Sequence, residues 1–409
     1  MKAVVFTLGC KVNRYESDLL AQDLRELGYD VTEELVPADL YVLNTCAVTG
    51  EAERKSRQSI ARCRALNPSA KIYVCGCASQ KSPTSFEREN VVFVSGAAGK
   101  DKIIESIRNK PIINAFSPLP SLYEDGFLTT ADRTRAYVKI QDGCNSFCSY
   151  CIIPYLRGRS RSRAKESVVK EVEELSKKTA EIVLIGVNLM DYGKDIGTDL
   201  ATLIRALSPF DVRIRLGSFY AEGITEELLE ALFSLKKFCP HFHLSLQSGD
   251  DDVLKAMNRK YVRQEYADKI ALIRSFDKNA CITTDIITGF PTETDENHKN
   301  SIDFIREMRF SDIHVFPFSS REGTRAARLS SLPPEVVKKR KNELLKLKEE
   351  LIDDYLTKNI GVEQSVLTEE KIGEYYCGYS QYYIRVYTKR QGDISCLPVK
   401  KHKDGLMEV

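Results

Sequence analysis

The sequence predicts an α/β protein with an N-terminal parallel-sheet domain, a partial (βα)6 barrel in the middle and a small C-terminal β domain. Apolar runs alternate with amphipathic stretches over the first 110 residues, and a second alternating series begins near residue 134. The last fifty residues change character, and residues 379–387 alternate with period two, which indicates a small β domain. A chain of 409 residues is longer than one core usually organises, so we expect two or three domains.

The first domain, residues 1–120, is expected to contain a buried parallel sheet. Helical spacing covers residues 15–27 and 50–66, which lie between the apolar runs. The segment 111–133 contains several prolines and shows no period, so it is interpreted as a linker. The predicted strands are residues 3–8, 40–43, 71–74 and 91–94.

The second domain, residues 130–359, contains six predicted βα units, which favour an open barrel because a closed eight-unit barrel needs more chain. A long charged helix at 333–359 ends it, and residues 360–409 form the third domain. In that domain we expect one strand at 379–387. The predicted barrel strands are residues 137–140, 181–186, 213–217, 243–246, 283–287 and 314–318.

Composition limits the classes of function. The net charge is +2, so any contact with nucleic acid must use a local basic patch. No apolar run of membrane-spanning length is present, and the first residues are interpreted as a buried strand rather than a signal peptide. Twelve cysteines in such a chain indicate metal or redox ligands in a reducing cytoplasm. The oligomeric state stays open.

Cys144, Cys148 and Cys151 follow the first predicted strand of the barrel. A 4Fe–4S cluster normally takes four cysteines, so three leave one iron open. S-adenosylmethionine (SAM) can chelate that iron, and one electron then cleaves its sulfonium bond to give a 5′-deoxyadenosyl radical. A zinc site is the alternative, although zinc sites favour CxxC pairs with a fourth ligand nearby.

This spacing resembles that of the radical-SAM superfamily over residues 134–330. The resemblance implies a radical-SAM barrel in which Cys144, Cys148 and Cys151 are catalytic and Tyr150 contacts the SAM adenine. Residues at the ends of the second, fourth and fifth strands are expected to bind SAM too, although a glycine there could equally serve a simple turn. These residues are Gly186, Asn188, Gln247, Ser248, Gly289 and Glu293.

Cys10, Cys46 and Cys77 follow the first three strands of the N-terminal sheet. The carboxyl ends of parallel strands meet at one edge, so the three thiols should converge and could hold a second cluster with an open iron. Buried core cysteines are the alternative. Cys75 lies two residues before Cys77 and could compete for iron, although the Gly76-Cys77 motif favours Cys77.

The two triads together resemble the methylthiotransferase family over the whole chain. The resemblance implies two 4Fe–4S clusters, SAM as cofactor, tRNA as partner and a TRAM-like RNA-binding domain at 360–409. It also implies an electron donor of the flavodoxin or ferredoxin type. The motif 8–13, Leu-Gly-Cys-Lys-Val-Asn, resembles the branch that acts on carbon 2 of N6-threonylcarbamoyladenosine at tRNA position 37. The isopentenyladenosine branch typically has Gln-Met in place of Lys11-Val12.

Two groups of residues are candidates for RNA contacts. Four arginines follow the loop that contains Cys144, Cys148 and Cys151. They could bind phosphate, or they could form a solvated run. The face of Tyr379, Tyr383, Arg385 and Tyr387 could stack bases, or its tyrosines could fill a small core. Alternative functions are methylthiolation of isopentenyladenosine tRNA or of a ribosomal protein, and a non-catalytic iron–sulfur RNA-binding protein. The four arginines are Arg157, Arg159, Arg161 and Arg163.

Overall fold

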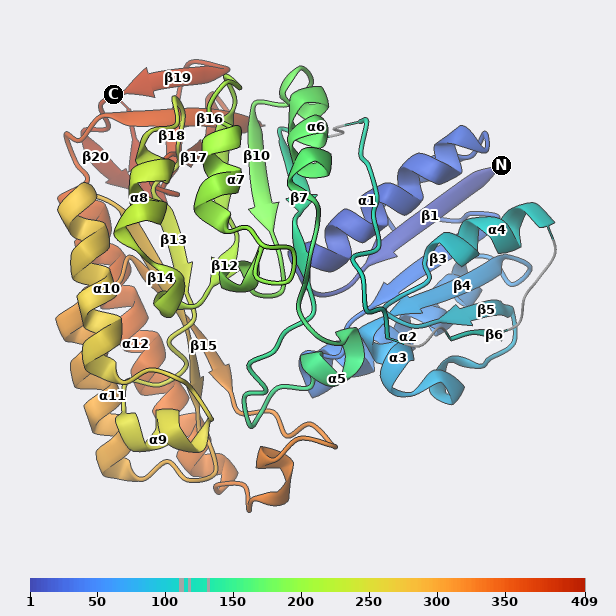
Figure 1. The fold of residues 1–409 in the computed structure, drawn as a ribbon, viewed down its shortest axis with the longest axis horizontal. Helices are drawn as coiled ribbons and strands as arrows, with labels where there is room; N and C mark the ends of the chain where they lie inside the picture. The colour runs from blue at the N-terminus through green and yellow to red at the C-terminus, as the bar shows by residue number, and fades with distance from the viewer. Residues whose placement is uncertain (110–113, 117–118, 131–132, 409) are drawn as a thin grey trace.

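The structure, a computed structural model, describes residues 1–409 except 110–113, 117–118, 131–132 and 409. An N-terminal sheet domain lies beside a curved wall of parallel strands that is backed by helices, and the C-terminal strands cover one end of that wall (Figure 1). The predicted fold class is therefore confirmed. The exact domain limits 1–120, 130–359 and 360–409 stay predictions.

The N-terminal sheet has six parallel strands in the order β2-β1-β3-β4-β5-β6. Its central strand β3 is buried at every residue, because helices cover both faces. The helices are α1 (Lys11–Glu26), α2 (Gly50–Leu66), α3 (Cys77–Lys81) and α4 (Asp101–Asn109). The strands are β1 (Lys2–Thr7), β2 (Asp30–Thr32), β3 (Leu40–Thr45), β4 (Lys71–Gly76), β5 (Val91–Ser95) and β6 (Asn114–Ala115).

The barrel wall consists of two parallel sheets, β11-β10-β7 and β12-β13-β14-β15, and contains all six predicted strands. The largest buried apolar cluster of the chain fills the space between this wall and its helices. The strands are β7 (Arg135–Lys139), β10 (Glu181–Ile185), β11 (Arg213–Leu216), β12 (Ser218–Phe219), β13 (His241–Leu244), β14 (Cys281–Thr288) and β15 (Asp312–Pro317). The helices are α6 (Lys165–Ser176), α7 (Leu200–Ala206), α8 (Glu226–Phe233), α9 (Asp251–Ala256), α10 (Arg263–Phe276), α11 (Asp295–Met308) and α12 (Pro334–Lys358).

The loop after β7 contains three short elements: β8 (Gln141–Asp142), α5 (Ile153–Arg157) and β9 (Arg161–Ser162). The predicted linker 111–133 lies partly outside the described residues. Within it, residues 119–130 have no helix or strand but pack between α1 and α6. The Tyr15 hydroxyl donates to the Gly126 carbonyl at 2.9 Å, and the Leu128 N–H donates to Glu171 at 2.8 Å. This segment therefore packs against both domains, in addition to linking them along the chain.

The C-terminal domain is a six-stranded sheet in the order β19-β16-β17-β18-β21-β20. The predicted single strand at 379–387 is wrong, because the chain turns between β17 and β18 and pairs Tyr379 with Arg385. Tyr383 takes a φ of 59° in that turn. Tyrosine rarely adopts this conformation, so the sequence does not indicate a turn there. The strands are β16 (Gln364–Ile372), β17 (Tyr375–Ser380), β18 (Arg385–Thr388), β19 (Asp393–Cys396), β20 (Lys400–His402) and β21 (Gly405–Met407).

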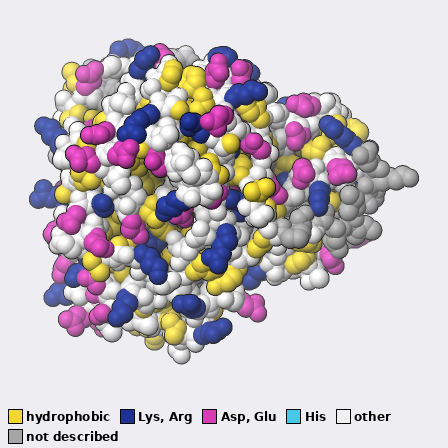
Figure 2. Space-filling view, viewed as in Figure 1, with side chains coloured by type: hydrophobic (Ala, Val, Ile, Leu, Met, Phe, Trp, Pro, Cys, Tyr) yellow, Lys and Arg dark blue, Asp and Glu magenta, His cyan; other side chains and the backbone are white. Residues whose placement is uncertain are grey.

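The surface shows the balanced charge that the composition predicts. On the face in Figure 2, lysine and arginine side chains are interspersed with aspartate and glutamate. Among the described residues, no helix combines the length and the apolar character needed to cross a membrane.

Candidate active site

A cavity of about 680 Å³ lies between the edge of the N-terminal sheet and the interior of the barrel. Five of the six triad cysteines line it, so the two triads face the same space. The sixth, Cys148, is buried beside it, where its sulfur accepts a hydrogen bond from Arg259 at 3.4 Å. The five lining cysteines are Cys10, Cys46, Cys77, Cys144 and Cys151.

Close packing of loops brings the N-terminal thiols together. Gly9 has a φ of 100°, and a Cβ there would lie 2.6 Å from the Cys46 sulfur. The loop between β1 and α1 can therefore approach Cys46 only because residue 9 is glycine. The Asn13 amide donates to the Leu8 carbonyl at 2.9 Å and to the Thr45 carbonyl at 3.0 Å, which ties the ends of β1 and β3 together.

The structure separates Cys75 from Cys77. Gly76 ends β4 with a φ of 104°, so the strand alternation does not continue to Cys77, which begins α3. Cys75 packs in the core with Val5 and Val42, whereas Cys77 lines the cavity. A cluster ligand at this strand end is therefore expected at Cys77.

We expect Cys77→Ala to lower the iron content of anaerobically reconstituted protein from about eight to about four atoms per chain, because one four-iron cluster would lose a ligand. Cys75→Ala should keep the full load, because it removes only a core thiol. Iron analysis of the two purified variants checks both expectations, and the reverse pattern would show that Cys75 is the ligand.

The barrel triad, Cys144, Cys148 and Cys151, also lies on a loop in which backbone segments approach closely. The Cys144 N–H donates to the Gly158 carbonyl at 3.1 Å, and a Cβ on Gly143 would lie 2.0 Å from the Arg159 carbonyl oxygen. Burial raises the pKa of Cys46 and of Cys151 to about 12. These thiols therefore stay protonated until a metal displaces the protons. Three converging sulfurs on each side fit two four-iron clusters, each with one iron free for another ligand.

The residues predicted to bind SAM fall into two groups. Tyr150, Gly186 and Gln247 line the cavity. The other four make internal contacts, and the role of all seven in binding SAM stays a prediction. Asn188 donates to Asp191 at 2.9 Å, Ser248 bonds Ser301 at 3.2 Å, and Glu293 accepts from the Gly289 N–H and from Arg340, both at 2.8 Å.

The arginine run does not form the predicted phosphate-binding surface. Arg157, Arg161 and Arg163 are at most 4% exposed and pair with buried carboxylates. Arg157 contacts Glu16 at 2.9 Å and Asp142 at 3.0 Å, and Arg163 pairs with Glu171. Arg159 alone in the run is exposed, and its guanidinium lies 4.5 Å from the ring centroid of Phe147. The alternative of a solvated run is wrong for the other three, because Arg157 and Arg163 contact Glu16 and Tyr15 of α1 and Arg161 pairs with Asp142.

The predicted base-stacking face of the C-terminal domain borders the cavity. Tyr383 stacks on His241 of β13 with ring centroids 4.3 Å apart, and on Tyr379 at 4.8 Å. The Tyr387 hydroxyl donates to Asp404 at 2.7 Å. Tyr379, Tyr383 and Arg385 line the cavity and Tyr383 remains exposed there, so stacking of a base on this face stays a prediction.

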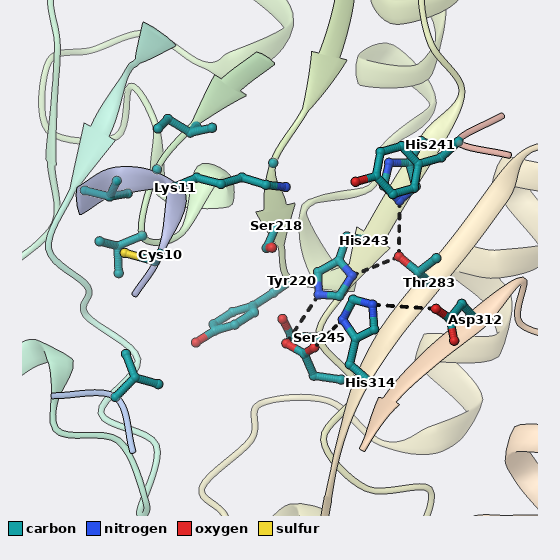
Figure 3. A pocket seen from close by; sticks show the side chains of 18 of the residues that line it. Cys10, Lys11, Ser218, Tyr220, His241, His243, Ser245, Thr283, Asp312 and His314 are labelled. Carbon is teal, nitrogen blue, oxygen red and sulfur yellow. Dashed lines mark hydrogen bonds and ion pairs between the residues drawn. The ribbon is translucent and has the colours of Figure 1, made fainter. Parts of the chain in front are cut away.

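Sequence reasoning missed a polar group on the barrel wall (Figure 3). Asp285 lies 3.3 Å from a ring nitrogen of His243 and 3.3 Å from one of His314, and Thr283 bonds His243 at 2.8 Å. The two histidines hold the pKa of Asp285 well below its usual range, although burial alone would raise it. Lys11, next to Cys10, also lines the cavity. The sequence signal that could have revealed this group is the alternation of polar residues in two strands, His241 and His243 in β13 and Thr283 and Asp285 in β14.

Two family models match the chain: the radical SAM superfamily at residues 138–305, and the uncharacterized protein family UPF0004 at residues 2–96. The chain is also 39% identical over 395 residues to threonylcarbamoyladenosine tRNA methylthiotransferase MtaB of Thermotoga maritima, covering 94% of this chain and 91% of the relative. The chain belongs to the radical SAM methylthiotransferase family. Enzymes of this family are transferases that use SAM and two 4Fe–4S clusters.

Other members of the methylthiotransferase family act on a different nucleoside. The tRNA-2-methylthio-N(6)-dimethylallyladenosine synthase of Pelotomaculum thermopropionicum is 36% identical, covering 89% of this chain and 86% of the relative. Among solved structures, the radical S-adenosylmethionine methyltransferase TsrM of Kitasatospora setae, with cobalamin and a 4Fe–4S cluster bound, gives a TM-score of 0.54 at 14% identity. That match covers 77% of this chain and 74% of TsrM and shows a shared fold.

Proposed function

We propose that this enzyme attaches a methylthio group to carbon 2 of N6-threonylcarbamoyladenosine at position 37 of tRNA. The observation that carries the proposal is the single cavity onto which both cysteine triads open. A sulfur carried on one side and a radical generated on the other could then reach the same carbon. The relatives from Thermotoga maritima and Bacillus subtilis, 39% and 37% identical, are named for this substrate.

In this proposal Cys144, Cys148 and Cys151 hold the cluster that binds SAM. When bound, that cluster supplies the electron that cleaves the sulfonium bond of SAM. Arg259 would support this site, because its guanidinium donates to the Cys148 sulfur and also lies 3.9 Å from the ring centroid of Tyr220. Tyr150, whose side chain lines the cavity, would lie against the SAM adenine.

Cys10, Cys46 and Cys77 hold the second cluster, which carries the sulfur to be transferred. The sheet edge fixes these sulfurs opposite the barrel triad, so the substrate base would lie between them. The reaction needs a reductant, and we assign a flavodoxin- or ferredoxin-type donor in the cytoplasm, where tRNA is modified. The terminal domain 360–409 would contact the tRNA body.

The substrate test gives reconstituted enzyme two tRNAs that differ at position 37, one with threonylcarbamoyladenosine and one with isopentenyladenosine. Mass spectrometry of the digested nucleosides should show a methylthio product from the first tRNA and at most a few per cent as much from the second. A product from the isopentenyl substrate alone would assign the enzyme to the other branch of the family.

A further inference from the structure

Lys11 brings a positive charge into the cavity without a partner of its own. It follows Cys10 at the start of α1, and its side chain extends across the cavity toward the barrel wall (Figure 3). Within the described part of the chain, its ammonium makes no hydrogen bond or ion pair. Other charged lining groups are paired: Arg157 with Glu16 at 2.9 Å, Arg385 with Asp404 at 2.8 Å, and Asp312 with Lys348 at 2.7 Å.

The surroundings of Lys11 do not supply a counter-ion. Asp285 and Glu181 act on Lys11 through space without contacting it, and Asp285 is already shared by His243 and His314. Arg215 and Arg135 add further positive charge near the ammonium. The Lys11 side chain is accessible within the cavity, so an anionic group of a substrate can reach it and form a charge-assisted contact.

The position of Lys11 identifies the part of the substrate that carries this charge. Carbon 2 of adenine must reach the cysteine side of the cavity, and carbon 2 and carbon 6, which carries N6, flank the same ring nitrogen. The N6 substituent therefore lies beside the reacting carbon, whereas the tRNA phosphates are separated from it by the ribose. A carboxylate on the N6 substituent would reach Lys11 while the base stays between the two triads.

We propose that Lys11 is the specificity-determining residue of this site and that its ammonium pairs with the carboxylate of the N6-threonylcarbamoyl group. The assignment rests on the proposed function. His243, Thr283 and His314 form a polar wall next to this contact, where the hydroxyl and urea groups of the substituent can hydrogen-bond. An uncharged isopentenyl group would leave the lysine unpaired and would place its methyl groups against polar side chains.

The test compares equilibrium binding of three anticodon stem-loop RNAs to reconstituted enzyme. They carry threonylcarbamoyladenosine, its methyl ester, or isopentenyladenosine at position 37. We expect Lys11→Gln to weaken binding of the acid about 10- to 100-fold, because a charge-assisted contact is lost, and to leave the ester and isopentenyl RNAs within about twofold. Lys11→Arg should restore part of the preference. Lys236→Gln, which removes an exposed lysine of the barrel, is the matched control and should change nothing.

Iron content is measured for each variant, because Lys11 adjoins a proposed cluster ligand. If Lys11→Gln weakens acid and ester equally, or does not weaken the acid, the assignment of Lys11 is wrong. If that happens while wild-type enzyme still methylthiolates threonylcarbamoyladenosine tRNA, the proposed function stands without it. If the wild type methylthiolates only the isopentenyl tRNA, the proposed function fails and the assignment of Lys11 fails with it.

Discussion

Replacing Cys10, Cys46 and Cys77 together with alanine should abolish methylthio transfer while SAM cleavage continues. The three sulfurs lie on the sheet edge, across the cavity from the barrel triad, so their removal should leave the SAM site intact. We expect the iron content to fall from about eight to about four atoms per chain. Product should fall below detection, a loss of at least about 10³-fold, because the group to be transferred would have no carrier.

The measurement pairs two assays on the same reduced samples: 5′-deoxyadenosine released from SAM, and methylthiolated nucleoside in tRNA. The mirror variant, with Cys144, Cys148 and Cys151 changed to alanine, should lose both activities. Cys63→Ala controls for loss of a buried thiol, because Cys63 packs in the core of the N-terminal domain. Methylthiolated tRNA from the first triple variant would show that the N-terminal triad does not carry the sulfur.

The convergence of the cysteines was predictable because it follows from local rules. Strands buried on both faces, such as β3, appear in the sequence as continuous apolar runs, and their order along the chain places their carboxyl ends together. A cysteine that follows each run within a few residues is therefore expected at one edge of the sheet. The same reasoning placed Cys144 on the loop that follows β7.

Contacts between distant segments could not be predicted in the same way. Arg157 is buried because Glu16, 141 residues earlier, meets it, and no spacing in the sequence shows that pairing. The direction of Lys11 depends on how α1 docks on the barrel. The turn at Tyr383 contains no glycine or proline, and the stacking of its ring on His241 fixes it instead. These features depend on domain packing rather than on local preference.

Glu16→Gln should destabilise the protein by about 3–5 kcal/mol, because it removes one of two carboxylates that neutralise a buried cluster of cations. Glu16 contacts Lys100 at 2.9 Å, Lys139 at 3.0 Å and Arg157 at 2.9 Å. The other carboxylate, Asp142, already serves Lys139, Arg157 and Arg161. The neutral amide would leave the cations to repel one another where α1 meets the barrel. Because the two triads lie on opposite sides of this contact, methylthio transfer should fall more than SAM cleavage.

The pH dependence of stability provides a second test of Glu16. Burial alone would raise the pKa of Glu16, but Arg157, Lys100 and Lys139 hold it well below its usual range. A lowered pKa in the folded state contributes stability that is present above the unfolded value, about 4.3, and is lost as the pH falls toward the folded value. The Gln variant should therefore lose less stability than the wild type between about pH 4.5 and 3.

Urea denaturation at pH 7 and at acid pH measures both effects. Glu26→Gln, at the exposed end of the same helix, is the matched control and should stay within about 0.5 kcal/mol of the wild type. If Glu16→Gln and Glu26→Gln have equal stability at pH 7, the buried cluster does not hold the two domains together. If Glu16→Gln is destabilised but makes product in the wild-type ratio to 5′-deoxyadenosine, the cluster stabilises the fold without setting the distance between the triads.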